Sequence, residues 1–532
     1  MRGMQALKRL TVGGLLRRAA ARYPERPALE YMGRIWTYRE LDAEVDLTAR
    51  RLLAVGVRRG DHVGIWCETG PNAIFALYAA VRLGAVTAML NTSLHREELR
   101  ILLERNDISR LLIGSGCKHV SYPGLCRGMT EEVLGLQEIL YIGEETAAGD
   151  IASLAEQPLV SEDELRWAEC QVMPEDTAYI LYTSGTTGLP KAVMGSHFSR
   201  VNCGIMQAHD LRATEQDRFC VALPLFHCFC LSVNVMAACA VGGCLYIPES
   251  RRTAALLKAV SVGRCTVMSC VPALYHAMLC RPDFKSFDLS SLRIGFIGGC
   301  PYPPALFRQI EEAFGFTLLS SLGQTEATGG LTVSSPDDPI EVRAETVGHF
   351  MDHLEGQIVD PHTRAELPVG EVGEICVRGY VVMQGYYGQP KETAATVDEE
   401  GWLYTGDLGY LDGRGNLHLT GRLKDLIIRG GENISPAEIE AVAAGDTMVK
   451  TSKAIGVPDS HYGEEVCLCI TPRDPSAFDE GKLRKRLKQR LAPYKVPKYI
   501  LLIDELPVSE TGKIQTKQLK AFAEKKLALC LT

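Results

Sequence analysis

The run Leu181-Tyr-Thr-Ser-Gly-Thr-Thr-Gly-Leu-Pro-Lys191 combines two glycines, four serine or threonine side chains and a lysine, directly after an apolar segment. Glycines let a backbone wrap closely around an anion, and hydroxyl and ammonium groups donate to phosphate oxygens. The run therefore predicts a phosphate-binding loop that follows a strand. Its spacing differs from the Walker pattern, because Lys191 lies three residues beyond Gly188 and precedes Ala192. Taken alone, a flexible glycine and threonine loop fits the run equally well.

Short apolar runs alternate with amphipathic stretches between about residues 37 and 300. Five of these runs predict strands: 62–67, 110–114, 178–182, 266–270 and 293–297. Because the runs are continuously apolar, we expect strands covered on both faces, within an α/β fold of layered, parallel-rich sheets and helices. After about residue 340 the sequence alternates in polarity and is punctuated by glycine, as in 373–379 and 412–420, which predicts β-hairpins.

The chain length and the change in residue pattern along the chain predict the domains. A chain of 532 residues exceeds one hydrophobic core, so two or three domains are expected. We expect a large N-terminal domain over residues 1–421, with a β-rich subdomain over about 340–421. A small, mobile α+β domain is expected over residues 422–532.

Two helices are predicted in this C-terminal domain. Ser435-Pro-Ala-Glu438 has the spacing of a capping box with proline at the first helical position, and Gly445 predicts the helix end. Leucines recur at helical spacing from Leu483 to Leu491 among the basic residues of 482–490. These basic residues either attract the phosphate groups of a ligand or form an ordinary solvated face.

Composition excludes several classes of protein. The net charge of -8 gives no general attraction to nucleic acid or anionic lipid. The 18 cysteines include no C-x-x-C pair, and neither Cys228-Phe-Cys230 nor Cys467-Leu-Cys469 resembles a zinc site. The N-terminal region lacks a secretory cleavage site, and no stretch has the length of a membrane span, so we expect a cytoplasmic protein with reduced thiols.

Further segments accompany the first run in a fixed order. They are Leu223-Pro-Leu-Phe-His227, Gly298-Gly-Cys-Pro301, Leu322-Gly-Gln-Thr-Glu326, Gly373-Glu-Ile-Cys-Val-Arg-Gly379, Trp402-Leu-Tyr-Thr-Gly-Asp407, Gly421-Arg-Leu-Lys-Asp-Leu-Ile-Ile-Arg-Gly-Gly-Glu-Asn433 and Thr511-Gly-Lys513. Together they resemble the adenylate-forming superfamily, which contains acyl-CoA synthetases, aryl-CoA ligases, luciferases and adenylation domains. The resemblance covers essentially the whole chain.

The resemblance implies that a carboxylic acid is joined to AMP from ATP and then transferred to a thiol. A carboxylate is a poor acyl donor because oxide would have to leave. Adenylation releases pyrophosphate and makes the acyl carbon electrophilic. Because two anions must meet, the protein has to neutralise charge and position the reactants. The sequence contains no G-x-S-x-G motif that would indicate an acyl-enzyme serine.

The resemblance also assigns the nucleotide site. The residues implied to cradle the β- and γ-phosphates are Thr183, Ser184, Gly185, Thr186, Thr187, Gly188 and Lys191. Thr325 and Glu326 resemble the pair near the α-phosphate, and Glu326 is implied to hold Mg²⁺. Further nucleotide-binding positions are Gly298, Gly299, Cys300, Gly323 and Gln324. Leu322 departs from the pattern, because many members have an aromatic residue there that stacks on adenine.

The C-terminal part supplies the remaining implied roles. Asp407 resembles the carboxylate that accepts the ribose hydroxyls, and Arg422 a second nucleotide contact. Lys513 corresponds to the lysine that bridges the substrate carboxylate and the α-phosphate, for which a compact, mobile charge is suited. Lys424 corresponds to a hinge. One lid orientation would present Lys513, and another would bring Gly430-Gly431 to line a thiol channel.

The acid pocket is implied to be apolar. His227 resembles the residue that gates the acyl pocket. Amino-acid-activating relatives place an aspartate near this position, but His227-Cys-Phe-Cys230 contains no carboxylate, and an unpaired buried ammonium would be costly. The pocket segments 267–275 and 300–303 are mostly apolar. An aliphatic or aromatic acid of moderate size is therefore expected.

The sequence predicts an ATP- and Mg²⁺-dependent carboxylic acid:coenzyme A ligase that acts on fatty or aryl acids. Coenzyme A is the expected acceptor because no carrier module is appended before Thr532. A separate acyl-carrier protein is the alternative acceptor, and an inactive adenylate-binding homologue is a further alternative. The retained charges of the implied site argue against inactivity. A homo-oligomer is left open.

Overall fold

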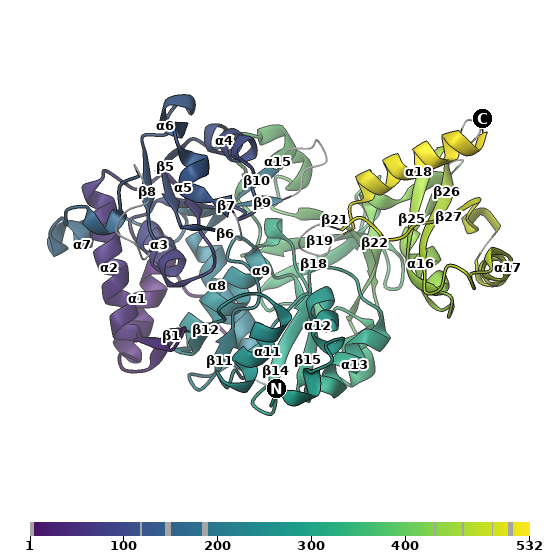
Figure 1. The fold of residues 1–532 in the computed structure, drawn as a ribbon, viewed down its shortest axis with the longest axis horizontal. Coiled ribbons are helices and arrows are strands. Elements are labelled where there is room, and N and C mark those ends of the chain that lie inside the picture. The colour runs from purple at the N-terminus through teal and green to yellow at the C-terminus, as the bar shows by residue number, and fades with distance from the viewer. Residues whose placement is uncertain are drawn as a thin grey trace. The chain divides into compact units, whose positions relative to one another are not determined.

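The computed structural model describes residues 5–117, 120–143, 151–183, 190–429, 432–459, 462–491, 493–508 and 514–531. The chain forms two compact units (Figure 1). The first contains Met1–Gly356 and Val377–Leu403, and the second contains Gln357–Cys376 and Tyr404–Thr532. The expected α/β fold with parallel-rich sheets, a large N-terminal domain and a smaller C-terminal domain is confirmed. The boundary expected at residues 421 and 422 stays a prediction.

The largest sheet of the first unit has nine strands. Their order is β17 (His349–Phe350), β16 (Thr332–Val333), β15 (Thr317–Leu322), β14 (Ile294–Gly298), β13 (Val267–Met268), β11 (Arg218–Cys220), β12 (Cys244–Ile247), β1 (Pro27–Tyr31) and β2 (Arg34–Thr37). Every pair from β15 to β1 is parallel, and the pairs at both edges are antiparallel.

A second sheet of the first unit has seven strands. Their order is β20 (Gly385–Tyr386), β10 (Lys191–Ser196), β9 (Thr177–Thr183), β4 (Val86–Met89), β3 (His62–Trp66), β5 (Ile108–Ile113) and β8 (Glu138–Tyr141). The pairs from β9 to β8 are parallel, whereas β10 is antiparallel to both β9 and β20. The five predicted strands are thereby confirmed as β3, β5, β9, β13 and β14.

Both faces of these sheets are covered, which explains their continuously apolar strands. One core cluster joins the inner faces of both sheets to helices α1 (Val12–Arg22), α2 (Tyr38–Ala54), α3 (Pro71–Arg82), α8 (His197–Asp210) and α10 (Ala237–Val241). In β5, Leu112 belongs to this inner cluster, whereas Leu111 and Ile113 belong to an outer cluster. Successive strand residues point to opposite faces, so a strand buried on both sides must be apolar throughout.

Further helices cover the outer faces (Figure 1). The outer face of the seven-stranded sheet packs against α4 (Arg96–Arg105), α5 (Tyr122–Cys126) and α6 (Met129–Glu132). The outer face of the nine-stranded sheet packs against α11 (Thr253–Ser261), α12 (Pro272–Leu279) and α13 (Pro304–Phe314). Other helices of the first unit are α7 (Glu162–Cys170), α9 (Cys228–Cys230), α14 (Ile340–Glu345) and α15 (Pro390–Thr396).

The predicted hairpins are confirmed in a four-stranded sheet with the order β18 (Leu354–Val359), β19 (Gly373–Gly379), β21 (Leu403–Leu411) and β22 (Leu417–Arg422). The second unit contains a five-stranded sheet: β24 (Glu432–Ile434), β23 (Ile427–Arg429), β26 (Gly463–Pro472) and β25 (Val449–Asp459), with β27 (Tyr499–Leu502) beside β26. One core cluster of this unit includes residues of α16 (Pro436–Ala444) and α17 (Glu480–Arg490), and another includes residues of α18 (Thr516–Leu531).

The details of the C-terminal helices confirm one expectation and correct another. Helix α16 begins at Pro436 after Ser435 and ends before Gly445, as predicted, but the predicted capping box does not form. The Ser435 hydroxyl instead donates to the Thr420 carbonyl at 2.7 Å, and Glu438 accepts from Lys495 at 2.6 Å. The two side chains that would have capped the helix therefore form hydrogen bonds with residues outside it.

The leucine stripe of α17 is buried as predicted. Cys467 and Cys469 lie in the core cluster that includes α18 residues, and the cysteines in the described ranges are free thiols. No helix of the described residues combines the length and apolar character that a bilayer crossing requires.

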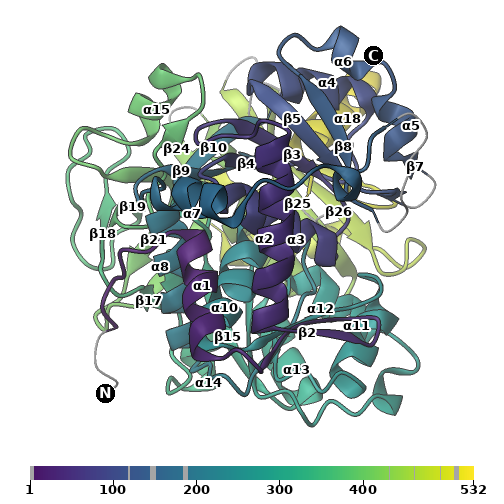
Figure 2. The ribbon, with the colours of Figure 1, turned by 90° about the vertical axis from the view of Figure 1, so that its left-hand side faces the viewer.

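A buried ion-pair network joins the helices between the two sheets. The Arg82 side chain, at the end of α3, is fully buried and pairs with Asp42 and Asp46 of α2. Arg17 of α1 pairs with the same two carboxylates, at 2.7 Å each. Helices α2 and α3 pack against each other (Figure 2), and this network holds their polar ends together.

Replacing Arg82 by methionine should lower the free energy of unfolding of the first unit by about 1.5–3 kcal/mol, because the substitution removes charged hydrogen bonds to two half-buried carboxylates and leaves them with only part of their positive charge. Urea unfolding would measure the change. The matched control is Arg39→Met on α2, because the Arg39 side chain is 68% exposed and pairs with Glu25 at the surface. Equal losses for both variants would contradict the role of burial.

Candidate active site

Most of the predicted site segments of the first unit directly follow the carboxyl ends of four parallel strands. Strand β11 leads toward His227, β13 toward Val271, β14 toward Gly299 and β15 toward Glu326. Since β11, β13, β14 and β15 are consecutive and parallel, these segments leave the sheet at the same edge. Ligands of parallel α/β sheets bind outside the carboxyl ends of the strands. The fold therefore brings together segments that the sequence singled out separately.

Close backbone approach explains two glycines at this edge. Gly298 is aligned with Ser321, and a Cβ atom at Gly298 would lie 2.6 Å from the Ser321 carbonyl oxygen. A Cβ atom at Gly323 would lie 2.4 Å from the Gly329 carbonyl oxygen. Glycine is needed at both positions for the chain to close on itself. The implied nucleotide contacts of Gly298 and Gly323 stay predictions.

The short turn η4 (Thr325–Ala327) carries the predicted carboxylate. The Tyr386 hydroxyl donates to Glu326 Oε1 at 3.0 Å, and the Met383 N–H donates to the Glu326 carbonyl at 2.8 Å. Thr325 Oγ1 lies 3.8 Å from the Cys228 sulfur, beside His227. The turn is thus tied both to β20 and to the segment implied to gate the acyl pocket.

The residue after this turn is held in an unusual conformation. Thr328 is fully buried with φ of 56°, a left-handed conformation that is uncommon for threonine. Its carbonyl accepts from Ser232 at 2.7 Å and from Arg200 at 3.1 Å. Its hydroxyl donates to the Val381 carbonyl at 2.6 Å and accepts from Tyr179 at 3.2 Å. Hydrogen bonds from three elements therefore fix the backbone that follows Glu326.

Arg200 is a buried cation that the sequence analysis missed. Its side chain lies over the Tyr179 ring, 3.9 Å from the centroid, and Nη1 donates to Ser232 Oγ at 2.6 Å. Nη1 also lies 3.4 Å from the Cys228 carbonyl oxygen. No pattern around Ser199-Arg-Val201 indicated this role, because the partners come from distant parts of the chain.

The predicted phosphate loop joins two antiparallel strands. Strand β9 ends at Thr183, β10 begins at Lys191, and these two residues are paired. Lys191 Nζ lies over the Tyr386 ring, 4.3 Å from the centroid. The loop residues Ser184, Gly185, Thr186, Thr187 and Gly188 lie outside the described residues. The apolar strand predicted directly before the loop is confirmed as β9.

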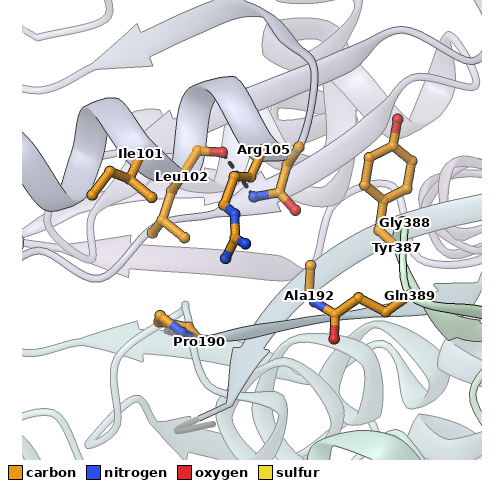
Figure 3. A pocket seen from close by; sticks show the side chains of 9 residues that line it. Ile101, Leu102, Arg105, Pro190, Ala192, Tyr387, Gly388 and Gln389 are labelled. Atoms are coloured by element: carbon orange, nitrogen blue, oxygen red, sulfur yellow. Dashed lines mark hydrogen bonds between the residues drawn. The ribbon is translucent and has the colours of Figure 1, made fainter. Parts of the chain in front are cut away.

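The face of β10 that carries Ala192, opposite to the face that carries Lys191, borders a small cavity of about 140 Å³ (Figure 3). Its lining includes Arg105, Ala192 and Tyr387. The Tyr387 hydroxyl binds the Asp107 carboxylate. None of the predicted site residues lines this cavity.

His227 precedes an irregular helical stretch. It lies directly before α9, and its ring contacts that of Phe226 with the centroids 4.6 Å apart. A π-helical segment, η2 (Leu231–Met236), follows α9 and is wholly buried. The described residues contain no group of three or more histidine, cysteine, aspartate or glutamate side chains that could hold a metal ion. Cys230 is part of the core, as expected for a structural thiol.

Asp407 and Arg422 are paired residues of the second unit. They are aligned across β21 and β22, and Arg422 Nε lies 2.8 Å from Asp407 Oδ1. Asp407 is buried, whereas the Arg422 side chain is 46% exposed. Glu374 accepts the Gly406 N–H at 2.8 Å and so holds the turn before Asp407. The approach of this pair to the first-unit residues stays a prediction.

The predicted hinge residue belongs to the second unit. Lys424 is exposed in the short turn η5 (Leu423–Asp425), between β22 and β23. Gly430, Gly431 and Lys513 lie outside the described residues.

Comparison with known proteins identifies the family. Residues 16–387 match the AMP-binding enzyme family, and residues 438–513 match its C-terminal domain. The chain belongs to the AMP-binding enzyme family.

Relatives in this family include named CoA ligases. The Bacillus subtilis protein YngI is 35% identical over 97% of this chain and 98% of its own length. The human medium-chain acyl-CoA ligase ACSF2, a mitochondrial protein, is 31% identical over 98% of this chain and 88% of its own. The crystal structure of the anthranilate CoA ligase AuaEII with anthranoyl-AMP has a TM-score of 0.86 and 25% identity, over 98% of this chain and 99% of that one. These relatives favour an AMP-forming acid–CoA ligase over the carrier-protein and inactive alternatives.

Replacing Thr328 by valine should lower the free energy of unfolding by about 2–4 kcal/mol, because it leaves the Val381 carbonyl and the Tyr179 hydroxyl without their buried partner. Chemical denaturation would measure this loss. Thr328→Ser keeps the hydroxyl and should stay close to the parent protein. The assignment fails if serine destabilises as much as valine.

Proposed function

We propose that this AMP-forming acid–CoA ligase activates a fatty or aryl acid. A carboxylate oxygen of the acid attacks the α-phosphorus of ATP, the bond to pyrophosphate breaks, and acyl-AMP forms. The thiol of coenzyme A then attacks the acyl carbon, and AMP leaves. The observation that carries this proposal is the arrangement of Lys191 and Glu326 around Tyr386, beside the turn that Thr325 ties to the His227 segment.

These residues suit a nucleotide with a magnesium ion. Thr325 and Glu326 offer the hydroxyl and carboxylate oxygens that Mg²⁺ prefers. Among the described residues, no cationic side chain forms an ion pair with Glu326, so its second oxygen stays available for the metal. Mg²⁺ usually keeps several waters and binds substrate phosphates, so a protein cage of three carboxylates is not required. The metal would neutralise phosphate charge, while Lys191 and Thr183 bind the β- and γ-phosphates.

Gln324 provides a further donor at the same turn. Its Nε2 is buried and has no hydrogen-bond partner within the described part of the chain. A buried amide without a partner costs free energy, and a ligand that accepts this hydrogen bond would recover it. We therefore assign Gln324, together with the backbone of Gly298, Gly299, Cys300 and Gly323, to nucleotide binding.

The second unit carries the remaining residues of the proposed reaction. Asp407 accepts hydrogen bonds from the ribose hydroxyls in this proposal, and the contact with Arg422 orients its carboxylate. Lys513 brings a positive charge between the substrate carboxylate and the α-phosphate. Rotation about Lys424 would then withdraw Lys513 and present Gly430-Gly431 to the incoming thiol.

An acid without an ammonium group suits the gate segment. Arg200 reaches the backbone of this segment at Cys228, and a buried guanidinium disfavours a second cation nearby. The segment around Val271 is apolar and packs on the inner core. These features support fatty or aryl acids rather than amino acids. We propose coenzyme A as the acceptor, and a fatty acid pathway, a cytoplasmic location and a homo-oligomer stay expectations.

The direct test is pyrophosphate release across a panel of fatty, aryl and amino acids, with and without coenzyme A. We expect release with fatty or aryl acids and thioester formation only when coenzyme A is present, because the segment His227-Cys-Phe-Cys230 offers no carboxylate to an ammonium. Mass spectrometry would identify acyl-AMP and acyl-CoA. Selective activation of amino acids would contradict the proposal.

Replacing Lys513 by alanine should reduce acyl-AMP formation by about 10²-fold or more, since the change removes the charge that lets the two anions approach. Thioester formation from supplied acyl-AMP and coenzyme A should be largely retained. The two half-reactions would be measured separately by pyrophosphate release and by thioester yield. Equal loss of both would show that the lid assignment is wrong.

A further inference from the structure

Tyr386 contacts both charged groups that the proposed function needs for ATP. Its ring lies under the Lys191 ammonium, and its hydroxyl donates to Glu326 Oε1 at 3.0 Å. One side chain thus holds a cation on its ring and an anion on its hydroxyl.

Strand pairing places Tyr386 at this point. Strand β20 pairs with β10 so that Tyr386 is opposite Val193. Because side chains alternate along a strand, Lys191 and Val193 share the face of Tyr386, whereas Ala192 and Tyr387 face the cavity of Figure 3. The contact between Tyr386 and Lys191 therefore follows from the register of two strands.

The tyrosine keeps the two charges separate. Among the described residues, Lys191 forms no ion pair with any carboxylate. A direct pair between Lys191 and Glu326 would neutralise both groups, and a phosphate or a metal ion would have to break it. Contacts with a neutral ring and a neutral hydroxyl are weaker, so a charged ligand can displace the ring from Lys191 and use the free oxygen of Glu326.

We infer that Tyr386 is a positioning residue for the ATP-dependent half-reaction: its ring holds Lys191 and its hydroxyl orients Glu326, so that both charges stay available to MgATP. This inference rests on the proposed function. A packing role alone would need only the ring, because Tyr386 also belongs to a small apolar cluster with Val193 and Met383. The hydroxyl is the part that packing does not explain.

The first variant is Tyr386→Phe, which keeps the ring and removes the hydrogen bond to Glu326. We expect the Kd for MgATP, measured by isothermal titration calorimetry, to rise about tenfold, as loss of a hydrogen bond to a charged group predicts. The Mg²⁺ concentration for half-maximal pyrophosphate release should rise as well. The KM for the acid, and thioester formation from supplied acyl-AMP, should be unchanged.

The matched control is Tyr387→Phe. This variant also removes a tyrosine hydrogen bond to a carboxylate, but at the residue directly after β20, whose side chain lines the cavity of Figure 3. It should leave MgATP binding and the Mg²⁺ dependence unchanged. Tyr386→Leu removes the ring as well, so its MgATP affinity should fall further than that of Tyr386→Phe. Thermal melting would identify a variant that fails to fold.

Three results would overturn the inference. They are parent-like MgATP affinity and Mg²⁺ dependence in Tyr386→Phe, an equal effect in Tyr387→Phe, and equal loss of the adenylation and thioester half-reactions. The calorimetric measurement needs no acid, so it separates this inference from the proposed function. If the parent protein binds MgATP but activates no acid, the proposed function fails, and the comparison of the two phenylalanine variants still decides the role of Tyr386.

Discussion

Parallel pairing of β11, β13, β14 and β15 is the constraint on which the candidate site depends. Parallel strands cannot be joined by tight turns, so each is followed by a longer connection that crosses a face of the sheet. The connections leave at one edge, and there they carry His227, Val271, Gly299 and Glu326. Residues nearly 100 positions apart, such as Cys228 and Thr325, come into contact for this reason.

In the candidate site, Lys191 and Glu326 are positioned by contacts with neutral groups. Glu326 receives a hydroxyl hydrogen bond instead of an ion pair in the described structure, and Lys191 lies on an aromatic ring. By contrast, the buried Arg82 side chain pairs with two half-buried carboxylates and so joins the helices between the sheets. The arginine between the sheets is thus paired with carboxylates, whereas Lys191 and Glu326 contact a neutral ring and a neutral hydroxyl.

Sequence patterns predicted the strands well because a continuous apolar run is visible in neighbouring residues. Each apolar run must be covered on both faces, and Leu111, Leu112 and Ile113 show this directly by alternating between two core clusters. The capping box at Ser435 was wrong for a physical reason. The Ser435 and Glu438 side chains instead form hydrogen bonds with Thr420 and Lys495, which lie outside the local sequence pattern.

The sequence by itself determined the strands, the family and the types of chemical group required, because these depend on residues close together in the chain or on recurring motifs. Only the tertiary structure decided that Tyr386 lies between Lys191 and Glu326, and that Arg200, Ser232 and Tyr179 hold the turn through Thr328. Those contacts depend on strand register and on the packing of a buried helix. Both are set by the burial of whole faces, which is a property of the assembled sheets and not of any single segment.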